Sequence, residues 1–115
     1  MRLILSLLFA LAVAALPAAA HHGWGSYDAD NPVTLEGAIA TSKFEQPHTE
    51  MTLTLEGLDW LVTLAPPSRM NNRGAVAELI APGKEIKAYG YPRRDGTKEI
   101  RAEWIEVDGQ HFELR

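Results

Sequence analysis

The histidines are the side chains of this sequence best suited to chemistry, and two of the four are adjacent. His21 and His22 follow an apolar segment that ends in three alanines (18–20), and His48 lies in a later polar stretch. If the chain is cut after Ala20, His21 offers one metal ion both a free amine and an imidazole. Both groups bind a metal only when deprotonated, and an α-amine with a pKa near ~8 loses its proton readily to a metal at neutral pH.

A second imidazole opposite His21 would complete a T-shaped three-nitrogen site, a histidine brace, with His48 as the expected ligand and His22 as its substitute. Nitrogen ligands of this kind favour Cu(II) over other divalent ions. Cleavage after Ala19 would instead place His22 third in the chain, where amine, two amides and imidazole also bind copper. Both cleavage positions therefore predict copper binding. The alternative is that the adjacent histidines, His21 and His22, bind copper or nickel weakly and that this binding has no biological role.

The first twenty residues have the three parts of a secretory signal. Arg2 supplies the positive start, an apolar run extends from Leu3 to Ala15, and Pro17 precedes the small residues that a signal peptidase needs. A membrane anchor is disfavoured because a spanning helix needs about 20 apolar residues. We therefore predict a signal peptide over 1–20, export to the periplasm, and no membrane span in the mature protein.

Cleavage of 20 of the 115 residues leaves 95, which suits one domain with a modest core. Ten basic and 15 acidic residues then remain, a net charge of −5, and such a surface argues against nucleic acid as a partner. The chain contains no cysteine, which excludes disulfides and thiolate metal sites.

Alternating apolar residues predict a mainly β domain over 33–115, after an irregular leader over 21–32 rich in glycine and turn formers. A glycine at 37 indicates a bulge or bend in the first strand. The Pro66-Pro67 pair predicts a rigid, extended exit from the third strand, and a short helix is expected over Gly74–Ile80. The six strands are expected at Val33–Phe44, Met51–Leu55, Leu58–Ala65, Lys84–Tyr91, Lys98–Val107 and His111–Leu114.

Three strands, a short helix and further strands are the order of a small OB-like Greek-key barrel, with an open β-sandwich carrying a helical insertion as the alternative. In such a barrel, the loop bearing His48 and the loop bearing Arg93 and Arg94 flank the binding face. Arg69, which follows the proline pair, could bind a carboxylate or phosphate group or clamp a nearby glutamate. These three arginines are the candidate residues for an anionic ligand. The alternative makes Arg93 and Arg94 a solvated hairpin tip and His48 a turn residue.

Several short motifs are spread along nearly the whole mature chain. They are His21-His22-Gly23-Trp24, the start of the first strand at Asn31 to Gly37, Pro47-His48, Ala65 to Met70, Pro82-Gly83 and Gly90-Tyr91-Pro92. With these motifs the sequence resembles a family of small exported proteobacterial proteins of unknown function. The usual Asn-Pro-His turn of that family has Gln46 in place of asparagine here. The resemblance implies a periplasmic OB-like domain with histidines at its start, and it brings no activity.

The leading hypothesis is therefore a periplasmic copper-binding protein that handles or delivers the metal. A second hypothesis is a binding module without metal, which would hold a periplasmic protein or a small anionic ligand at the OB face. No serine elbow, paired carboxylates or phosphate loop stands out, so an ordinary enzyme is not expected. A histidine-brace redox enzyme is the third and weakest reading, because a 95-residue barrel has little room for a substrate cleft.

Overall fold

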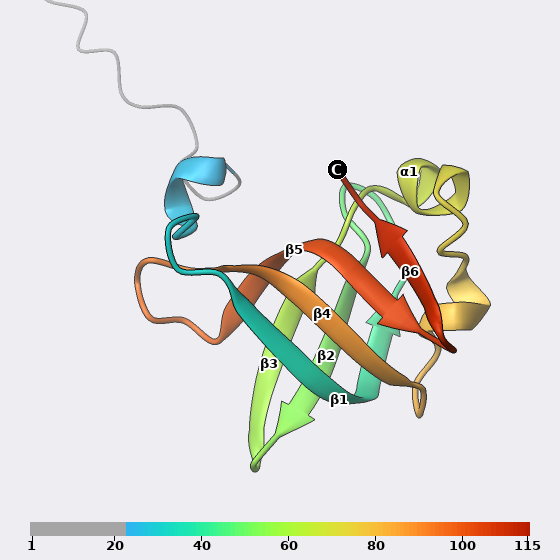
Figure 1. Ribbon diagram of the computed structural model, residues 1–115, viewed down its shortest axis with the longest axis horizontal. Coiled ribbons are helices and arrows are strands. Elements are labelled where there is room, and N and C mark those ends of the chain that lie inside the picture. Colours follow the sequence, from blue (N-terminus) through green and yellow to red (C-terminus); the bar gives the residue numbers. More distant parts are fainter. Residues whose placement is uncertain (1–22) are drawn as a thin grey trace, which may run out of the picture.

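The chain forms a five-stranded β-barrel with one extra strand and one short α-helix, in a computed structural model that describes residues 23–115. The predicted signal peptide and both His21 and His22 lie outside the described residues. Figure 1 shows the strands, which follow the order β3-β2-β1-β4-β5-β6 in one sheet. Their bounds are β1 Val33–Lys43, β2 Glu50–Leu55, β3 Leu58–Thr63, β4 Glu85–Pro92, β5 Glu99–Val107 and β6 Gln110–Glu113.

A short parallel pairing between β3 and β5 closes the sheet into a barrel. Leu61, Val62 and Thr63 of β3 lie beside Glu99, Ile100 and Arg101 of β5. The second half of β5 pairs with β6, which is an extra strand outside the five-stranded barrel. The OB-like fold predicted from the sequence is confirmed, and the sandwich alternative is excluded by this closure.

The first strand is long enough to serve both halves of the barrel. Residues 33–38 pair with β4, and the strand then bends so that residues 39–43 pair with β2. The sequence indicated a bulge or bend at Gly37, and the register shift lies slightly later, between Ile39 and Thr41. Gly37 has a different role: a Cβ atom there would lie 2.7 Å from Leu55 Cδ2, so glycine permits the close approach of β2.

The helix between β3 and β4 lies in the expected interval but not at the expected residues. The α-helix α1 spans Pro67–Asn72, whereas Ala77–Ile80 forms only a 3₁₀ turn, η2. Pro67 occupies the first helical turn, where proline's fixed φ suits a helix and its missing N–H is no loss. Gly74, at φ +88°, separates the two elements. The predictions of a helix over Gly74–Ile80 and of an extended exit after Pro66 were therefore wrong.

The core fills the barrel and extends under α1. Its largest fully buried side chains include Met51, Leu53, Leu64, Met70, Ile80, Ile100 and Ile105. Met70 is the buried residue of α1, so the helix closes one end of the barrel. Across residues 23–115, no helix has the length and apolar character needed to cross a membrane.

Candidate functional site

A pocket of about 290 Å³ lies on the outer face of the barrel, where the β1–β2 loop approaches β3 and β5. Its strand residues alternate with inward-facing core residues such as Val62 and Ile100, which places them on the outside. We call this site the mouth pocket. It is lined by Tyr27, Pro47, His48, Glu50, Leu61, Thr63, Arg93, Glu99 and Arg101.

The barrel closure builds the floor of the mouth pocket. Glu50 of β2 is the cross-strand partner of Thr63 in β3, and Thr63 is the parallel partner of Arg101 in β5. These three residues therefore form one row across three strands. Leu61 and Glu99 form the neighbouring row. Because facing side chains in adjacent strands lie about 5 Å apart, the row holds a carboxylate, a hydroxyl and a guanidinium on one surface.

His48 reaches the mouth pocket from the β1–β2 loop. The following residue, Thr49, is fully buried and continues the β3 pairing: its N–H donates to Ala65 O at 2.9 Å, and its carbonyl accepts from Leu64 N at 2.8 Å. These two bonds fix the end of the loop. The half-buried His48 side chain precedes this anchor directly, in a loop whose Gln46-Pro47 peptide bond is cis.

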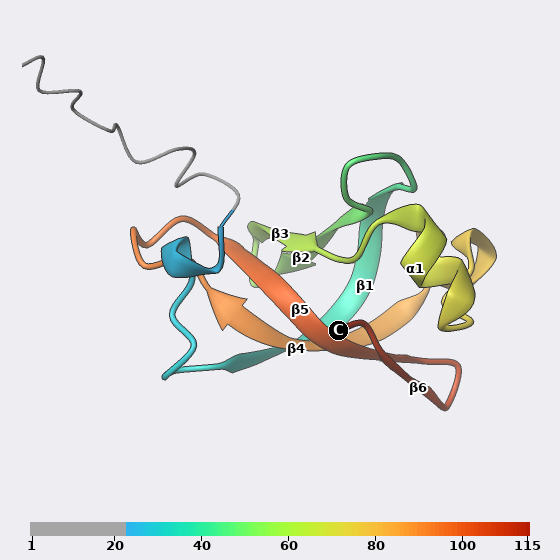
Figure 2. The same cartoon turned by 90° about the horizontal axis from the view of Figure 1, so that it is seen from above.

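The segment before β1 is held against the same pocket. Tyr27 is 4% exposed, forms an isolated bridge with Arg93, and its hydroxyl donates a hydrogen bond to Glu99 Oε2. The Asp28 N–H donates to Pro92 O at 2.8 Å. Figures 1 and 2 both show the turn at 24–26 beside the β4–β5 loop. The leader is therefore docked on the barrel through Tyr27.

Trp24 extends this docking across the wall of the pocket. The guanidinium carbon of Arg101 lies 4.1 Å from the Trp24 ring centroid, and the Tyr91 ring centroid is 5.9 Å away. Tyr91 is the cross-strand neighbour of Arg101. Contacts of a cation with an aromatic face contribute about 0.5–1 kcal/mol at exposed sites. Trp24 therefore covers Arg101, whose guanidinium also borders the mouth pocket.

Burial and pairing set the charge state of the pocket. Burial raises the pKa of the Tyr27 hydroxyl, and Glu99 raises it further, so the phenol is neutral at neutral pH. Arg93 lies 3.8 Å from a carboxylate oxygen of Glu99 and 3.5 Å from one of Asp95. The pocket therefore carries opposite charges that largely balance, with His48 at its edge.

The candidate arginines divide between this pocket and other places. Arg93 lines the mouth pocket with His48, so the structure brings these two together. The Arg94 guanidinium instead donates to Gly25 O at 3.2 Å and lies 4.0 Å from Asp28. Arg69 is exposed in the last turn of α1. Arg94 thus holds the leader.

Sequence reasoning missed the strand residues of the pocket, above all Arg101 and Glu50. Both occupy outward positions in strands whose alternation was recognised, which was the available signal. Their juxtaposition depends on the register between β3 and β5, two strands far apart in the chain. Periodicity within a strand does not encode that register.

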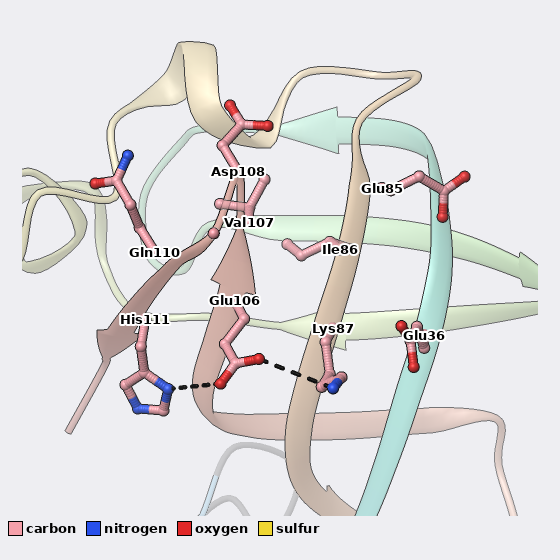
Figure 3. Close-up of a pocket in the computed structure, with 10 residues that line it drawn as sticks. Glu36, Glu85, Ile86, Lys87, Glu106, Val107, Asp108, Gln110 and His111 are labelled. Carbon is pink, nitrogen blue, oxygen red and sulfur yellow. Dashed lines mark hydrogen bonds and ion pairs between the residues drawn. The ribbon is translucent and has the colours of Figure 1, made fainter.

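A second hollow, of about 350 Å³, lies on the far part of β4, β5 and β6 and is shown in Figure 3. His111 lies there, with Nδ1 3.1 Å from Glu106 Oε1 and Nε2 2.7 Å from Glu113 Oε1. Hydrogen bonds to Glu113 and Glu106 raise the pKa of His111. Lys87 adds an ion pair to Glu106 at 3.9 Å, so the carboxylate of Glu106 has two partners in this charged hollow.

Metal ligands are sparse in the described part of the chain. Within residues 23–115, no group of three or more histidine, cysteine, aspartate or glutamate side chains is arranged to hold a metal ion. The mouth pocket has one imidazole, from His48, and the carboxylates of Glu50 and Glu99. His21 and His22, the other predicted ligands, lie outside the described residues.

The chain belongs to a family of unknown function, DUF6152, whose sequence pattern matches residues 10–101. A search of curated proteins found no match. Two solved structures share the fold. TiaS in complex with a tRNA and ATP aligns with a TM-score of 0.51 and 16% identity, over 67% of this chain and 18% of that one. The Stn1–Ten1 complex of S. pombe aligns with a TM-score of 0.51 and 15% identity, over 66% of this chain and 57% of that one.

These likenesses concern the fold alone. The aligned region is much shorter than either matched chain, and the sequence identities are low. The chemistry of the site must therefore come from its own residues.

Proposed function

Starting from membership of a family with no assigned activity, we propose that this chain is a periplasmic copper-binding protein that handles or delivers the metal. The proposed ligands are the amine and imidazole of His21 and the imidazole of His48, with His22 as substitute. The proposal rests on cleavage of the signal peptide after Ala20. Copper is here the cargo of the protein and drives no reaction.

The observation that carries the proposal is the docking of the leader beside His48. Tyr27 and His48 line the same pocket, and the Trp24 ring lies against Arg101 of its wall. Trp24 lies three positions after His21, and three residue steps span at most about 10 Å. Chain geometry therefore allows His21 to reach the mouth pocket from an anchor that the leader already has.

The chemistry of the pocket favours a nitrogen-ligated metal. The raised pKa of Tyr27 keeps its phenol protonated, so it is a poor ligand at neutral pH. Glu99 is engaged by Tyr27 and Arg93, and Glu50 is the other carboxylate that lines the pocket. Three nitrogen atoms with a nearby carboxylate suit Cu(II). Because no three-ligand group exists within 23–115, the site requires His21.

The fold likeness to TiaS, which was solved with a tRNA, does not redirect this proposal. A net charge of −4 for the whole chain gives poor electrostatic attraction to phosphate backbones.

The test is Cu(II) binding by the protein exported with its own signal and verified by mass to begin at His21. Electron paramagnetic resonance would report nitrogen couplings, and competition with a chelator would report affinity. We expect one tight site per chain. His48→Ala should weaken it by more than about 100-fold, since even losing a second-shell partner costs 10–100-fold.

Two controls make the test specific. His111→Ala removes a histidine from the charged hollow and should leave copper affinity unchanged. One additional N-terminal residue, placed in a His22→Ala background, displaces the amine from His21 without creating a new third-position histidine, and should also weaken binding. If His48→Ala binds with the same affinity and couplings, the brace is wrong, and the mouth pocket is then a face for a non-metal ligand.

A further inference from the structure

A third hollow, of about 710 Å³, lies between the first half of β1 and the β2–β3 hairpin. Residues 34–37 border it on one side, residues within 54–60 border it on the other, and Lys98 lies at its end. We call this hollow the edge cleft. Pockets that bind ligands measure about 300–1,000 Å³, so the edge cleft has the size of a binding site.

One side of the edge cleft is a strand edge that has no partner strand. Residues 33–38 of β1 pair with β4, and pairing with β2 begins only at Ile39, where β1 bends as Figure 2 shows. The Ile39 N–H donates to Lys84 O on the β4 side at 2.9 Å. Because hydrogen-bonded residues alternate along an antiparallel strand, Thr34 and Glu36 direct their N–H and C=O groups to the other edge. Within residues 23–115, no strand pairs with that edge.

The opposite side of the edge cleft is apolar. Leu58 is 52% exposed and is the most exposed large apolar side chain within residues 23–115. Leu55 and Trp60 are half-buried beside it and pack against the core. An occupant of the cleft would remove this apolar surface from water, which favours binding.

The ionisable side chains of the edge cleft are two carboxylates and one amine, from Glu36, Glu56 and Lys98. Within residues 23–115, no ion pair joins Glu36 or Glu56 to a basic side chain. Lys87 is the cross-strand partner of Glu36, but it pairs with Glu106, as Figure 3 shows. The cleft therefore attracts an occupant with a positive charge.

We propose that the edge cleft binds an extended, basic peptide segment of a partner protein, which adds as a strand to the free edge of β1. The backbone of the segment pairs with Thr34 and Glu36, and alternate apolar side chains face Leu58 and Trp60. A strand is the occupant that satisfies a row of backbone donors and acceptors, because a free edge presents them at strand spacing. The site contains none of the proposed copper ligands and goes beyond that function.

The test uses the mature, chelator-treated protein and a fluorescent peptide of about seven residues, the length of an ordinary strand, in which valine alternates with lysine and threonine. Fluorescence anisotropy measures affinity, and NMR spectra locate the site. We expect one peptide per chain, with the largest amide shifts at residues 33–37 and 54–60. Bound peptide should also slow amide hydrogen exchange at Thr34 and Glu36.

Two variants, each with a matched control, separate the backbone contact from the apolar contact. Thr34→Pro removes an N–H from the free edge, where proline is tolerated, and should weaken binding at least about tenfold. Thr34→Val keeps that N–H and should change affinity less than about twofold. Leu58→Ser should weaken binding about tenfold, because a leucine is no longer buried by the peptide. Val76→Ser alters another exposed apolar residue, outside the cleft, and should have no such effect.

Absence of peptide binding would overturn the proposal, and so would equal weakening by Leu58→Ser and Val76→Ser. Dimerisation of the chain without peptide, abolished by Leu58→Ser in sedimentation, would assign the edge cleft to a second copy and overturn it as well. A peptide with glutamate in place of lysine should bind more weakly, and equal binding would contradict the expected positive charge. His48→Ala should keep peptide affinity, since His48 lies outside the cleft, which separates this site from the copper proposal.

Discussion

Replacing Tyr27 with phenylalanine removes one hydroxyl from the contact that docks the leader and leaves the ring in place. The hydroxyl donates to Glu99, and both side chains are largely buried, at 4% exposure for Tyr27 and 14% for the Glu99 side chain. A hydrogen bond to a charged group contributes about 1.5–3 kcal/mol. Because Arg93 still pairs with Glu99, we expect a loss at the lower end, about 1.5–2 kcal/mol.

In a domain of this size, each 1 kcal/mol shifts the unfolding midpoint by about 4–8 °C, so Tyr27→Phe should melt about 10 °C below the wild type. Thermal unfolding followed by circular dichroism at neutral pH measures this. Tyr89→Phe is the matched control. Its ring stacks on Trp104 at 5.2 Å, and its hydroxyl makes no hydrogen bond within residues 23–115, so its midpoint should barely move. Equal melting of the two variants would refute the reasoning.

The same substitution has a pH signature. The pKa of Tyr27 is raised by burial and then by Glu99, so its neutral form is the one that the fold favours. That contribution to stability is complete below the ordinary value of 10.0 and is lost as pH rises through the higher folded pKa. The unfolding free energy of the wild type should therefore fall above pH 10 more steeply than that of Tyr27→Phe, as urea titrations on both sides of that pH would show.

Further predictions concern the barrel, the helix and the charged hollow. Gly90→Ala would place a Cβ 2.2 Å from the Arg101 carbonyl oxygen and should cost at least about 3 kcal/mol in urea unfolding, whereas Gly23→Ala, with open space around it, should cost little. Met70→Ala should cost about 2–5 kcal/mol in the same assay, because this side chain is fully buried. The raised pKa of His111 implies stability that is complete below 6.5 and lost as pH rises through the folded pKa. His111→Gln should flatten that loss, and NMR titration of the ring should show the raised pKa directly.

The alternation of apolar residues was enough to predict the strands, because each strand has one face in the core. Val33–Lys43 and Glu99–Val107 lie within a residue or so of their expected bounds. The bend in β1 was also expected, although the register shift lies beyond Gly37. Whether a side chain in a strand faces the core or the solvent depends on its neighbours in the sequence, so a single sequence is enough to predict it.

The sequence-based prediction placed the helix at the wrong residues because a proline can either end a regular element or begin a helix. Pro66 and Pro67 were interpreted as a break, and Pro66 is indeed extended, with ψ at 149°. Pro67 begins α1 instead, and the buried Met70 then holds that helix on the core. The spacing of Val76, Leu79 and Ile80 suggested a helix, but Val76 stays exposed and residues 77–80 form a 3₁₀ turn.

The candidate site could be predicted only in part. His48 and Arg93 were expected at one mouth because loop positions follow from the fold, and both line the mouth pocket. Arg101 was not expected there, since its place depends on β3 meeting β5 in one particular register. Arg94 was expected either to face a ligand or to lie at a solvated hairpin tip, but its guanidinium donates a hydrogen bond to Gly25 O of the leader. Such packing between distant segments has no signature in local sequence.

The parallel contact between β3 and β5 makes the mouth pocket the seam of the barrel. Only residues 61–63 and 99–101 pair there, so the ring is fastened by its shortest stretch of hydrogen bonds between strands remote in the chain. Pairing β3 with β5 closes a long loop of the chain, which costs conformational entropy. We therefore expect this contact to be the first part of the barrel to open in the native state. A ligand that contacts both Thr63 and Arg101 would hold β3 and β5 together. Its occupancy should slow amide hydrogen exchange in both strands, by an amount set by its concentration relative to its dissociation constant.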